Sequence, residues 1–258
     1  MNRLRVLIGC EFSGIVRDAF AARGHDAWSC DLLPSESPGP HYQGDIFDVI
    51  DGWMPVMFSA DCDEDGNCPV CGIDFAECLH PGPTQDGMEY IEKNGILFAR
   101  PEDSPSWDVM IAFPPCTDLC VSGAKHFAKK RANGQQQKSV EFFMKLANAP
   151  IKKIAIENPV GIMSSEWREP DQIVQPWMFG DEATKTTCLW LKGLRCLSYD
   201  APLFAESKIV GKGKRHVTKG GNSLPEWYNI PPTNPNRSKI RSTTFPGLGE
   251  AMAEQWGG

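Results

Sequence analysis

The chain has 258 residues, of which 41% are hydrophobic and 23% are charged, and its formal net charge is −7. This composition is ordinary for a globular protein, and the negative charge excludes a protein that is basic throughout. No apolar run approaches the roughly 20 residues of a membrane-spanning helix, and the first apolar run turns after about six residues, which argues against a signal peptide. We therefore expect a cytoplasmic protein without a membrane partner, whose ten cysteines are reduced thiols, metal ligands or catalytic groups rather than disulfides.

Short apolar strand patterns alternate with amphipathic helical patterns along the chain. Strands are expected at residues 4–9, 26–31, 107–113 and 152–159, and helices at residues 15–24 and 139–149. The alternation predicts an α/β fold with a doubly wound, mostly parallel sheet. Ligands of such a sheet bind beyond the carboxyl ends of its strands.

The first predicted strand is followed by Phe12-Ser13-Gly14 and then by a helix. Glycine lets the backbone approach a ligand there, and the helix N-terminus favours polar groups. Asp31 ends the second strand, where an acid can accept both hydroxyls of a ribose, and Asp45 lies near a third strand. Each acid alone is more often a helix cap or a turn residue, but together the three features predict a nucleoside-type cofactor. Because the loop lacks the dinucleotide and triphosphate patterns, S-adenosylmethionine fits best.

Residues 54–104 interrupt the alternation with a Cys-, Gly- and Asp-rich stretch, which we interpret as an insertion. It contains Cys62, Cys68, Cys71 and Cys78, with His80 as a reserve ligand. Four thiolates form a closed tetrahedral Zn²⁺ site, so a structural zinc is predicted. Unliganded reduced cysteines or a redox pair are the alternatives.

The strand at 107–113 ends abruptly on Pro114-Pro115-Cys116. Two prolines cannot continue the strand ladder, and they would direct Cys116 into the cleft as a nucleophile. The alternative is a small buried hydrophobic residue, which is how we interpret Cys120. Glu157 ends the next predicted strand, so parallel pairing would bring it close to Cys116. A buried carboxylic acid could protonate a pyrimidine ring and make its sixth carbon electrophilic towards the thiol.

Basic residues are concentrated in two stretches. Residues 125–138 hold five Lys and Arg and no acid, and residues 206–241 hold eight against two Glu. Basic patches on an acidic protein predict one face that meets phosphates, although solvated charge runs are an equal alternative. The glycines, prolines and lysines of residues 205–241 favour a mobile loop over a core element.

These motifs together resemble those of the cytosine-5 DNA methyltransferase family. The matching stretches are Glu11-Phe12-Ser13-Gly14, the acids Asp31 and Asp45, Pro114-Pro115-Cys116, Glu157-Asn158-Pro159 and the C-terminal "TTFPGLGEAMAEQW" of residues 243–256. The resemblance covers roughly residues 4–50, 107–195 and 237–256.

The resemblance implies one methyltransferase domain over residues 1–258, with the Rossmann-like fold of S-adenosylmethionine-dependent methyltransferases. Cys116 would be the nucleophile, Glu157 would hold a cytosine flipped out of double-stranded DNA, and residues 125–138 resemble the mobile loop that closes over it. S-adenosyl-L-methionine would be bound by Glu11, Phe12, Ser13, Gly14, Asp31, Asp45 and Pro114.

Three departures from the family pattern leave alternatives open. The Gln-x-Arg-x-Arg motif is missing, with Lys185 as its one obvious substitute, and Gly249-Glu250 replaces Gly-Asn in the closing motif. The large target-recognition domain is absent, unless residues 196–236 are a reduced form of it. Such compact chains resemble phage-encoded members. A free pyrimidine nucleotide as substrate, a modified methyl donor, and a catalytically inactive DNA-binding relative all remain open.

Overall fold

The computed structural model describes residues 2–56, 87–93, 96–102, 106–199, 208–218 and 220–258. Its strands are β1 (Arg5–Gly9), β2 (Asp26–Asp31), β3 (His41–Gln43), β4 (Met54–Pro55), β5 (Met88–Lys93), β6 (Ile96–Pro101), β7 (Val109–Ala112), β8 (Lys153–Asn158), β9 (Gln172–Val174), β10 (Thr187–Lys192), β11 (Arg215–Val217) and β12 (Ser223–Pro225). Its α-helices are α1 (Ile15–Ala21), α2 (Ile46–Val49), α3 (Phe127–Ala132), α4 (Gln135–Ala147), α5 (Met163–Glu166), α6 (Arg237–Ser242) and α7 (Pro246–Trp256). Three 3-10 helices are η2 (Val121–His126), η3 (Pro176–Phe179) and η4 (Glu226–Tyr228).

The centre of the described structure is a seven-stranded sheet in the order β3-β2-β1-β7-β8-β10-β9. β1 pairs in parallel with β2 and with β7, and β2–β3 and β7–β8 are also parallel. β10 runs antiparallel between β8 and β9. The chain winds from β1 towards β3 and then crosses to β7, so the winding reverses between β1 and β7. The carboxyl ends of these two strands frame the place where such sheets bind ligands.

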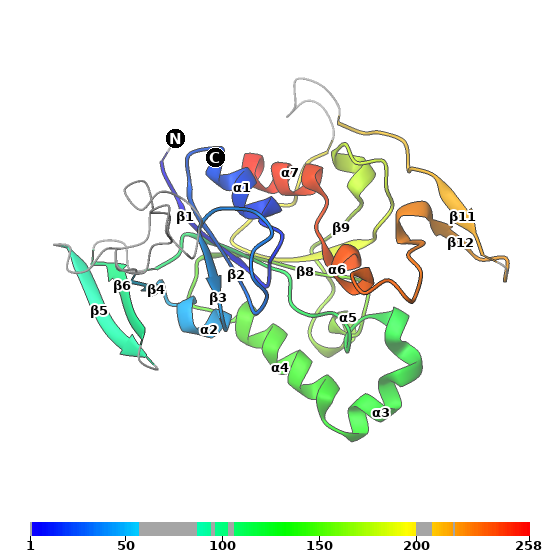
Figure 1. Cartoon of the computed structure of the whole chain (residues 1–258), viewed down its shortest axis with the longest axis horizontal. Helices are drawn as coiled ribbons and strands as arrows, with labels where there is room; N and C mark the ends of the chain where they lie inside the picture. The colour runs from blue at the N-terminus through cyan, green and yellow to red at the C-terminus, as the bar shows by residue number, and fades with distance from the viewer. Residues whose placement is uncertain (1, 57–86, 94–95, 103–105, 200–207, 219) are drawn as a thin grey trace.

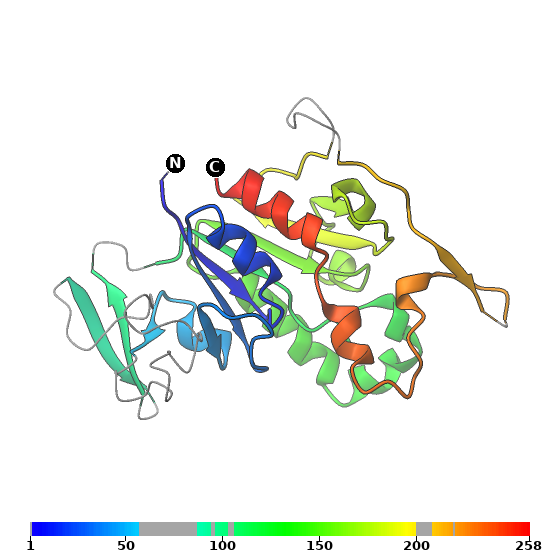
Figure 2. The same cartoon turned by 45° about the horizontal axis from the view of Figure 1, so that its top comes forward.

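Helices cover both faces of this sheet (Figures 1 and 2). Alternate side chains of β1 enter the two cores, Val6 with α1 and α7 on one face and Leu7 with α2 and α4 on the other. Phe20 and Trp256 fill the first core and Phe143 the second, all with at most 2% of their surface exposed. Each such side chain contributes about 1.5–3 kcal/mol to folding. Burial on both faces explains why the strands read as continuous apolar runs.

A buried arginine fixes the loop between β2 and β3. The Arg17 guanidinium is fully buried and donates to the hydroxyls of Ser29 and Ser35 and to the carbonyls of Ser37 and Pro38, at 3.0–3.1 Å. A buried guanidinium left without such partners would cost several kcal/mol. The loop is therefore tied to α1, and the end of β2 is held beside the end of β1.

The structure confirms each predicted strand and helix outside the two irregular regions, and α4 begins earlier than predicted, at Gln135. Within residues 54–104 the described part contains a separate antiparallel sheet in the order β4-β6-β5. The prediction of a loop for residues 205–241 is partly wrong, because this stretch contains the ribbon β11–β12, which projects from the body, and α6 (Figure 1). The ribbon strands are short and largely exposed, so they carry no apolar alternation that a pattern could detect. Among the described helices, none combines the length and the apolar character needed to span a membrane.

Candidate active site

A cavity of about 110 Å³ lies at the carboxyl ends of β1 and β7, and we call it the small cavity. Seven predicted site residues line it, and they come from the turn after β1, the end of β7, β8 and the segment before β10. These residues are Glu11, Phe12, Ser13, Pro114, Cys116, Glu157 and Lys185. Residues distant in the sequence are thus brought together at the point where the winding of the sheet reverses.

The end of β7 is tied to its neighbours on both sides. Phe113 donates its backbone N–H to the carbonyl of Gly9 in β1, at 2.9 Å, and the buried Asn158 donates its side-chain amide to the carbonyl of Pro114, also at 2.9 Å. The two prolines need no ladder partner at their nitrogens, so the chain can leave the sheet at this point. Cys116 is therefore presented, half-buried, into the small cavity.

Glu157 faces the same cavity from the end of β8. Its Oε1 atom is shielded from solvent and has no hydrogen-bond partner within the described residues. Burial raises the pKa of this carboxyl, and the nearby charge of Lys185 opposes that rise. A carboxyl that keeps its proton more easily than usual can act as a proton donor to a ligand.

Two cations line the small cavity. Lys185, which was predicted, donates through Nζ to the carbonyl of Thr243 at 3.1 Å. Arg241, which was not predicted, comes from α6, and its guanidinium carbon lies 3.4 Å from the centre of the Tyr228 ring. Burial lowers the pKa of Arg241, while the thiols of Cys116 and Cys120 act in the opposite direction. In the sequence, Arg241 is marked only by its position at the end of the basic stretch 206–241, just before the C-terminal motif.

Glu11 caps the helix that follows it. One carboxylate oxygen accepts from the backbone N–H of Val16 at 2.8 Å and from the Ser13 hydroxyl at 3.0 Å. The other oxygen, Oε2, is buried without a partner among the described residues, and burial raises the pKa of the group. Gly14 lines neither this cavity nor the larger one described next. Its φ of 77° and its tight packing against Arg17 account for the glycine there.

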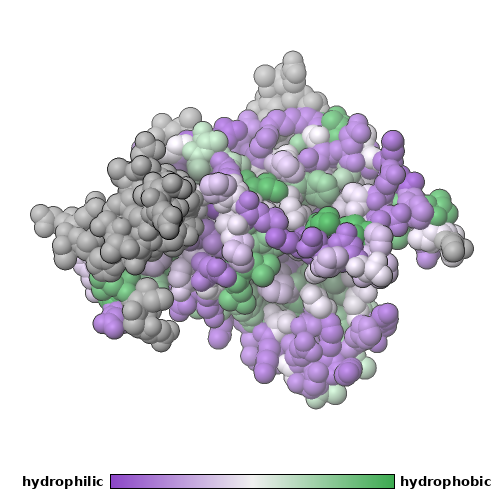
Figure 3. All heavy atoms as spheres, in the orientation of Figure 1, coloured by the Kyte–Doolittle hydropathy of each residue, from purple (hydrophilic) through white to green (hydrophobic). Residues whose placement is uncertain are grey.

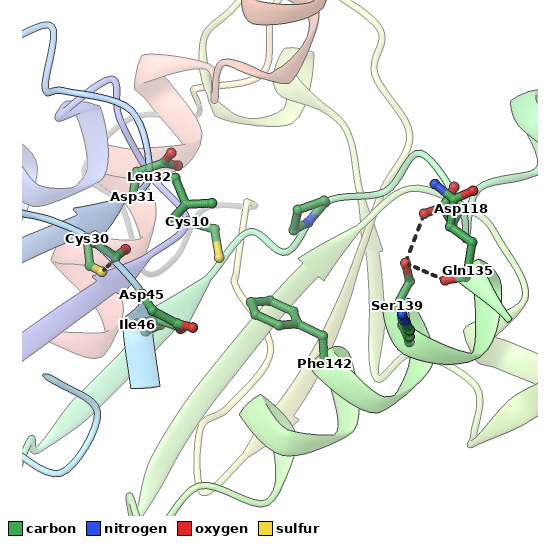
Figure 4. Close-up of a pocket in the computed structure, with 13 residues that line it drawn as sticks. Cys10, Cys30, Asp31, Leu32, Asp45, Ile46, Asp118, Gln135, Ser139 and Phe142 are labelled. Carbon is green, nitrogen blue, oxygen red and sulfur yellow. Dashed lines mark hydrogen bonds between the residues drawn. The ribbon is translucent and has the colours of Figure 1, made fainter. Parts of the chain in front are cut away.

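A cavity of about 350 Å³ adjoins the first, and we call it the large cavity. Cys10 and Pro115 line both cavities and form the wall between them. Asp31 and Asp45 line one side of the large cavity, and the Phe142 ring points towards them from α4 (Figure 4). Gln135 and Ser139 of α4 lie at its other end (Figure 4), and Lys138 of the same helix also lines the cavity.

Asp31 and Asp45, two of the three acids that line the large cavity, also serve the local backbone. Asp31 accepts from the N–H of Leu33 at 2.9 Å, and Asp45 caps α2 by accepting from the N–H of Phe47 at 3.0 Å. The turn and cap interpretations are therefore correct, and in addition both acids face the cavity. Each carboxylate accepts several hydrogen bonds, so oxygen lone pairs remain for a ligand.

Cys10 adopts an unusual backbone conformation between the two cavities. Its φ of 57° is the one positive value among the described non-glycine residues. A left-handed conformation costs an ordinary residue about 1–2 kcal/mol, and such strain is concentrated at functional sites. Burial raises the pKa of the Cys10 thiol to about 12.

The predicted zinc ligands Cys62, Cys68, Cys71 and Cys78, and the reserve His80, lie outside the described residues. Among the residues that are described, no cluster of three or more His, Cys, Asp or Glu could hold a metal ion. The zinc site therefore stays a prediction.

The predicted basic stretch 125–138 forms η2, α3 and the start of α4. Hydrophilic side chains gather over α3 on the face seen in Figure 3. Lys125, Lys129 and Lys138 are exposed, whereas Lys130 is tied to Asp118 and to the carbonyl of Thr117, each at 2.7 Å. Of the three exposed lysines, Lys138 also lines the large cavity.

No protein-family model matches this chain, and a search of curated proteins found no match. The site combines a thiol, a buried carboxyl whose pKa is raised and two cations in one cavity, and this cavity shares a wall with a larger one that has two acids on one side.

Proposed function

We propose that this chain is an S-adenosylmethionine-dependent methyltransferase that acts on carbon 5 of cytosine in DNA through a covalent bond to Cys116. The observation that carries the proposal is the shared wall between the two cavities. Cys116, Glu157 and Lys185 line the small cavity, and the large cavity, with Asp31 and Asp45, lies directly behind Cys10 and Pro115. A nucleophile site and a cofactor site in contact are what methyl transfer to a captured base requires.

The large cavity fits an adenosine-bearing donor. Its volume of about 350 Å³ lies in the range of small-ligand sites. Asp31, at the end of β2, is where a ribose diol is recognised in sheets of this kind. Ile46 and Phe142 offer apolar surface for a base between the acids and α4. S-adenosylmethionine, when bound, supplies an electrophilic methyl group.

The other end of the donor would extend towards the small cavity. Glu11 is buried there, with its Oε2 atom lacking a partner among the described residues. An ammonium group would satisfy that oxygen and ionise the carboxyl. The residues present therefore fit the donor at both of its polar ends.

The small cavity fits a pyrimidine ring. Sγ of Cys116 adds to carbon 6 of cytosine, while the Glu157 carboxyl gives its proton to the ring nitrogen N3. The electron pair of the 5,6 double bond moves to carbon 5, which becomes the nucleophile towards the methyl group. A base from solvent takes the carbon 5 proton, the electron pair of the sulfur–carbon bond returns to Sγ of Cys116, and N3 gives its proton back to Glu157, which restores the aromatic ring.

Lys185 and Arg241 would replace the missing Gln-x-Arg-x-Arg motif. Both line the small cavity, and both can donate to the ring carbonyl or to a phosphate next to the target base. With the exposed lysines of η2, α3 and α4, they favour a polymeric nucleic acid over a free nucleotide.

Transfer of tritium from labelled S-adenosylmethionine tests the proposal, with double-stranded DNA and free dCMP as parallel acceptors. We expect label in DNA that disappears in the Cys116→Ala variant. Label in dCMP alone would move the substrate to free nucleotides, and label in neither would indicate an inactive DNA-binding relative.

A stricter test uses DNA that contains 5-fluorocytosine, which traps the adduct because fluorine cannot leave carbon 5 as a proton does. Wild-type protein with cofactor should form a covalent complex that denaturing gels resolve. Glu157→Gln should form it slowly, and Cys116→Ala should not form it. Failure of the wild type to form it would overturn the mechanism.

A further inference from the structure

The ribbon β11–β12 projects from the body of the molecule, at the same end as α3 and α6 (Figures 1 and 2). Its described residues belong to neither core of the central sheet. A two-stranded ribbon is only marginally stable in water by itself. It therefore adds little to the stability of the fold, and this favours a role in binding.

Positive charge is concentrated on the ribbon and on the chain that leads to it. Residues 208–225 contain five Lys or Arg and no Asp or Glu, although the whole chain has a net charge of −7. An exposed basic element on an acidic protein favours an anionic partner.

The root of the ribbon is docked against the segment that carries Lys185. Gly213 lies so close to the carbonyl of Glu182 that a Cβ atom would clash with it, and its φ of 74° also favours glycine. The Trp227 indole, in η4 directly after β12, donates to the carbonyl of Thr184 at 3.2 Å. Because Thr184 precedes Lys185, which lines the small cavity, the root of the ribbon is fixed beside that cavity.

Aromatic rings tie the same root to another wall of the small cavity. The Trp227 ring packs edge-on against the rings of Tyr228 and Phe245, with centroids 5.4 Å and 5.2 Å apart. The Arg241 guanidinium lies over the Tyr228 ring. Arg241 and Thr244, the residue before Phe245, both line the cavity. The ribbon is therefore held in a fixed position relative to a base bound there.

The ribbon is also braced along its own length. Arg215 donates through Nε to the Ser223 hydroxyl and through Nη2 to the Ser223 carbonyl, each at 2.7 Å. At the turn, the Thr218 N–H donates to the carbonyl of Asn222 at 2.9 Å, and the Asn222 N–H donates to the Thr218 hydroxyl at 3.1 Å. Arg215 is therefore part of the framework of the ribbon.

The two faces of the ribbon differ. Successive residues of a strand point to opposite faces, so Arg215 lies on one face, and Lys214 and His216 lie on the other. His216 pairs with Leu224 across the ribbon, which adds an apolar side chain to the second face. Lys214 and His216 are exposed, and within the described residues no hydrogen bond or ion pair holds either side chain. This face is therefore available to a partner.

We propose that the ribbon β11–β12 enters the major groove of double-stranded DNA next to the base held in the small cavity. This inference rests on the proposed function. The major groove, about 12 Å wide, admits a two-stranded ribbon, whereas the minor groove is only about 6 Å wide. Lys214 pairs with a phosphate, while His216 bonds a base edge and Leu224 contacts a thymine methyl group.

Binding of the full-length chain to fluorescent duplexes, measured by anisotropy at low salt without donor, tests the groove. One duplex is unmodified. In the other, thymines carry a bulky group on carbon 5, which fills the major groove and leaves cytosines, phosphates and the minor groove unchanged. The wild type should bind the modified duplex about tenfold more weakly or less tightly still. The double variant Lys214→Gln/His216→Ala should lose most of this discrimination, because its ribbon gains little from the groove.

Salt dependence tests the phosphate contact of Lys214. In Lys214→Gln, the slope of log affinity against log salt concentration should decrease by about 0.9, the value for one phosphate. Lys152→Gln is the matched control. It removes the same charge from an exposed lysine that precedes β8, at the amino ends of the parallel strands and outside both cavities. Its slope should equal that of the wild type.

Three results would overturn the inference: equal slopes for Lys214→Gln and Lys152→Gln, wild-type affinity that ignores the modified thymines, or no binding to either duplex. The binding assay needs no methyl transfer, so the two proposals can fail separately. A chain that methylates DNA while its ribbon variants bind like Lys152→Gln refutes this inference alone. A chain that binds through the ribbon but transfers no methyl group refutes the proposed function alone. Thermal unfolding followed by circular dichroism checks that these surface variants fold.

Discussion

The two adjoining cavities differ in how their polar groups are satisfied. In the large cavity, Asp31 and Asp45 already accept hydrogen bonds from the local backbone. In the small cavity, Glu157 Oε1 and Glu11 Oε2 are buried without partners among the described residues. An unpartnered buried oxygen costs about 1–3 kcal/mol, so the small cavity is kept at the expense of stability. Under the proposed function, this contrast corresponds to donor binding in the large cavity and to chemistry in the small one.

The Cys116→Ala variant is the most severe test of this proposed difference between the two cavities. Loss of the only nucleophile proposed should lower methyl transfer by at least about 10³-fold, because no other described group can replace it. Donor affinity should stay within about twofold, since Cys116 lines the small cavity and not the large one. Tritium transfer and calorimetric titration with S-adenosylmethionine measure the two effects. A large loss of donor affinity would mean that Cys116 contributes to donor binding, and that the two cavities do not have separate roles.

Glu157→Gln tests whether the small cavity trades stability for activity. Transfer should fall by about 10²- to 10⁴-fold, the usual contribution of a general acid. The free energy of unfolding of the glutamine variant should instead be higher than that of the wild type. Burial raises the pKa of Glu157, so the folded chain keeps a proton that the unfolded chain has already lost above pH 4.3 or thereabouts. The wild type therefore loses stability as pH rises through this window, and the glutamine variant does not.

Urea unfolding at pH 5 and pH 8 measures this effect. The free energy of unfolding of Glu157→Gln should exceed that of the wild type by about 1 kcal/mol or more at pH 8. The difference should be smaller at pH 5. Glu141→Gln, an exchange on the surface of α4, is the control for the loss of one carboxylate. A glutamine variant that is equally or less stable at both pH values would show that Glu157 is well accommodated when ionised.

Asp31→Ala and Asp45→Ala test the large cavity. In Asp31→Ala we expect the affinity for the donor to fall about tenfold or more, while kcat stays largely unchanged. Asp45→Ala should also lose about 1 kcal/mol of unfolding free energy, because Asp45 caps α2. Asp45→Asn separates the two roles, since asparagine caps as well as aspartate. Titration calorimetry and urea unfolding give both quantities. Unchanged donor affinity in Asp31→Ala would remove the ribose assignment.

The sequence was sufficient for the parts of the site that depend on local chain geometry. The apolar runs marked β1, β7 and β8, and the residues directly after them had to meet at one edge of a parallel sheet. Cys116 and Glu157 could therefore be predicted together. The resemblance supplied Asn158, but its bond to the Pro114 carbonyl is a structural finding.

What the sequence could not give depends on tertiary contacts. Arg241 lies in a short helix whose path back to the sheet has no local signal. The sequence predicts that Gly14 lets a ligand approach, whereas its neighbour in the structure is the buried Arg17. The ribbon β11–β12 was missed because exposed strands have no apolar face.

Arg241→Gln should give the smallest effect, and it tests whether the cations of the small cavity serve substrate or only the thiols. Arg241 is half-buried over Tyr228 and can reach a ligand in the cavity, so its loss should lower kcat/KM for DNA about five- to tenfold, or about 1 kcal/mol. Arg237→Gln is the matched control, because it removes the same charge from the same helix but its side chain bonds the Ile230 carbonyl, away from the cavity. Steady-state rates at two salt concentrations measure both variants. Equal losses in the two would assign the effect to the general charge of α6, and a loss confined to Arg241 would place this residue at the target base.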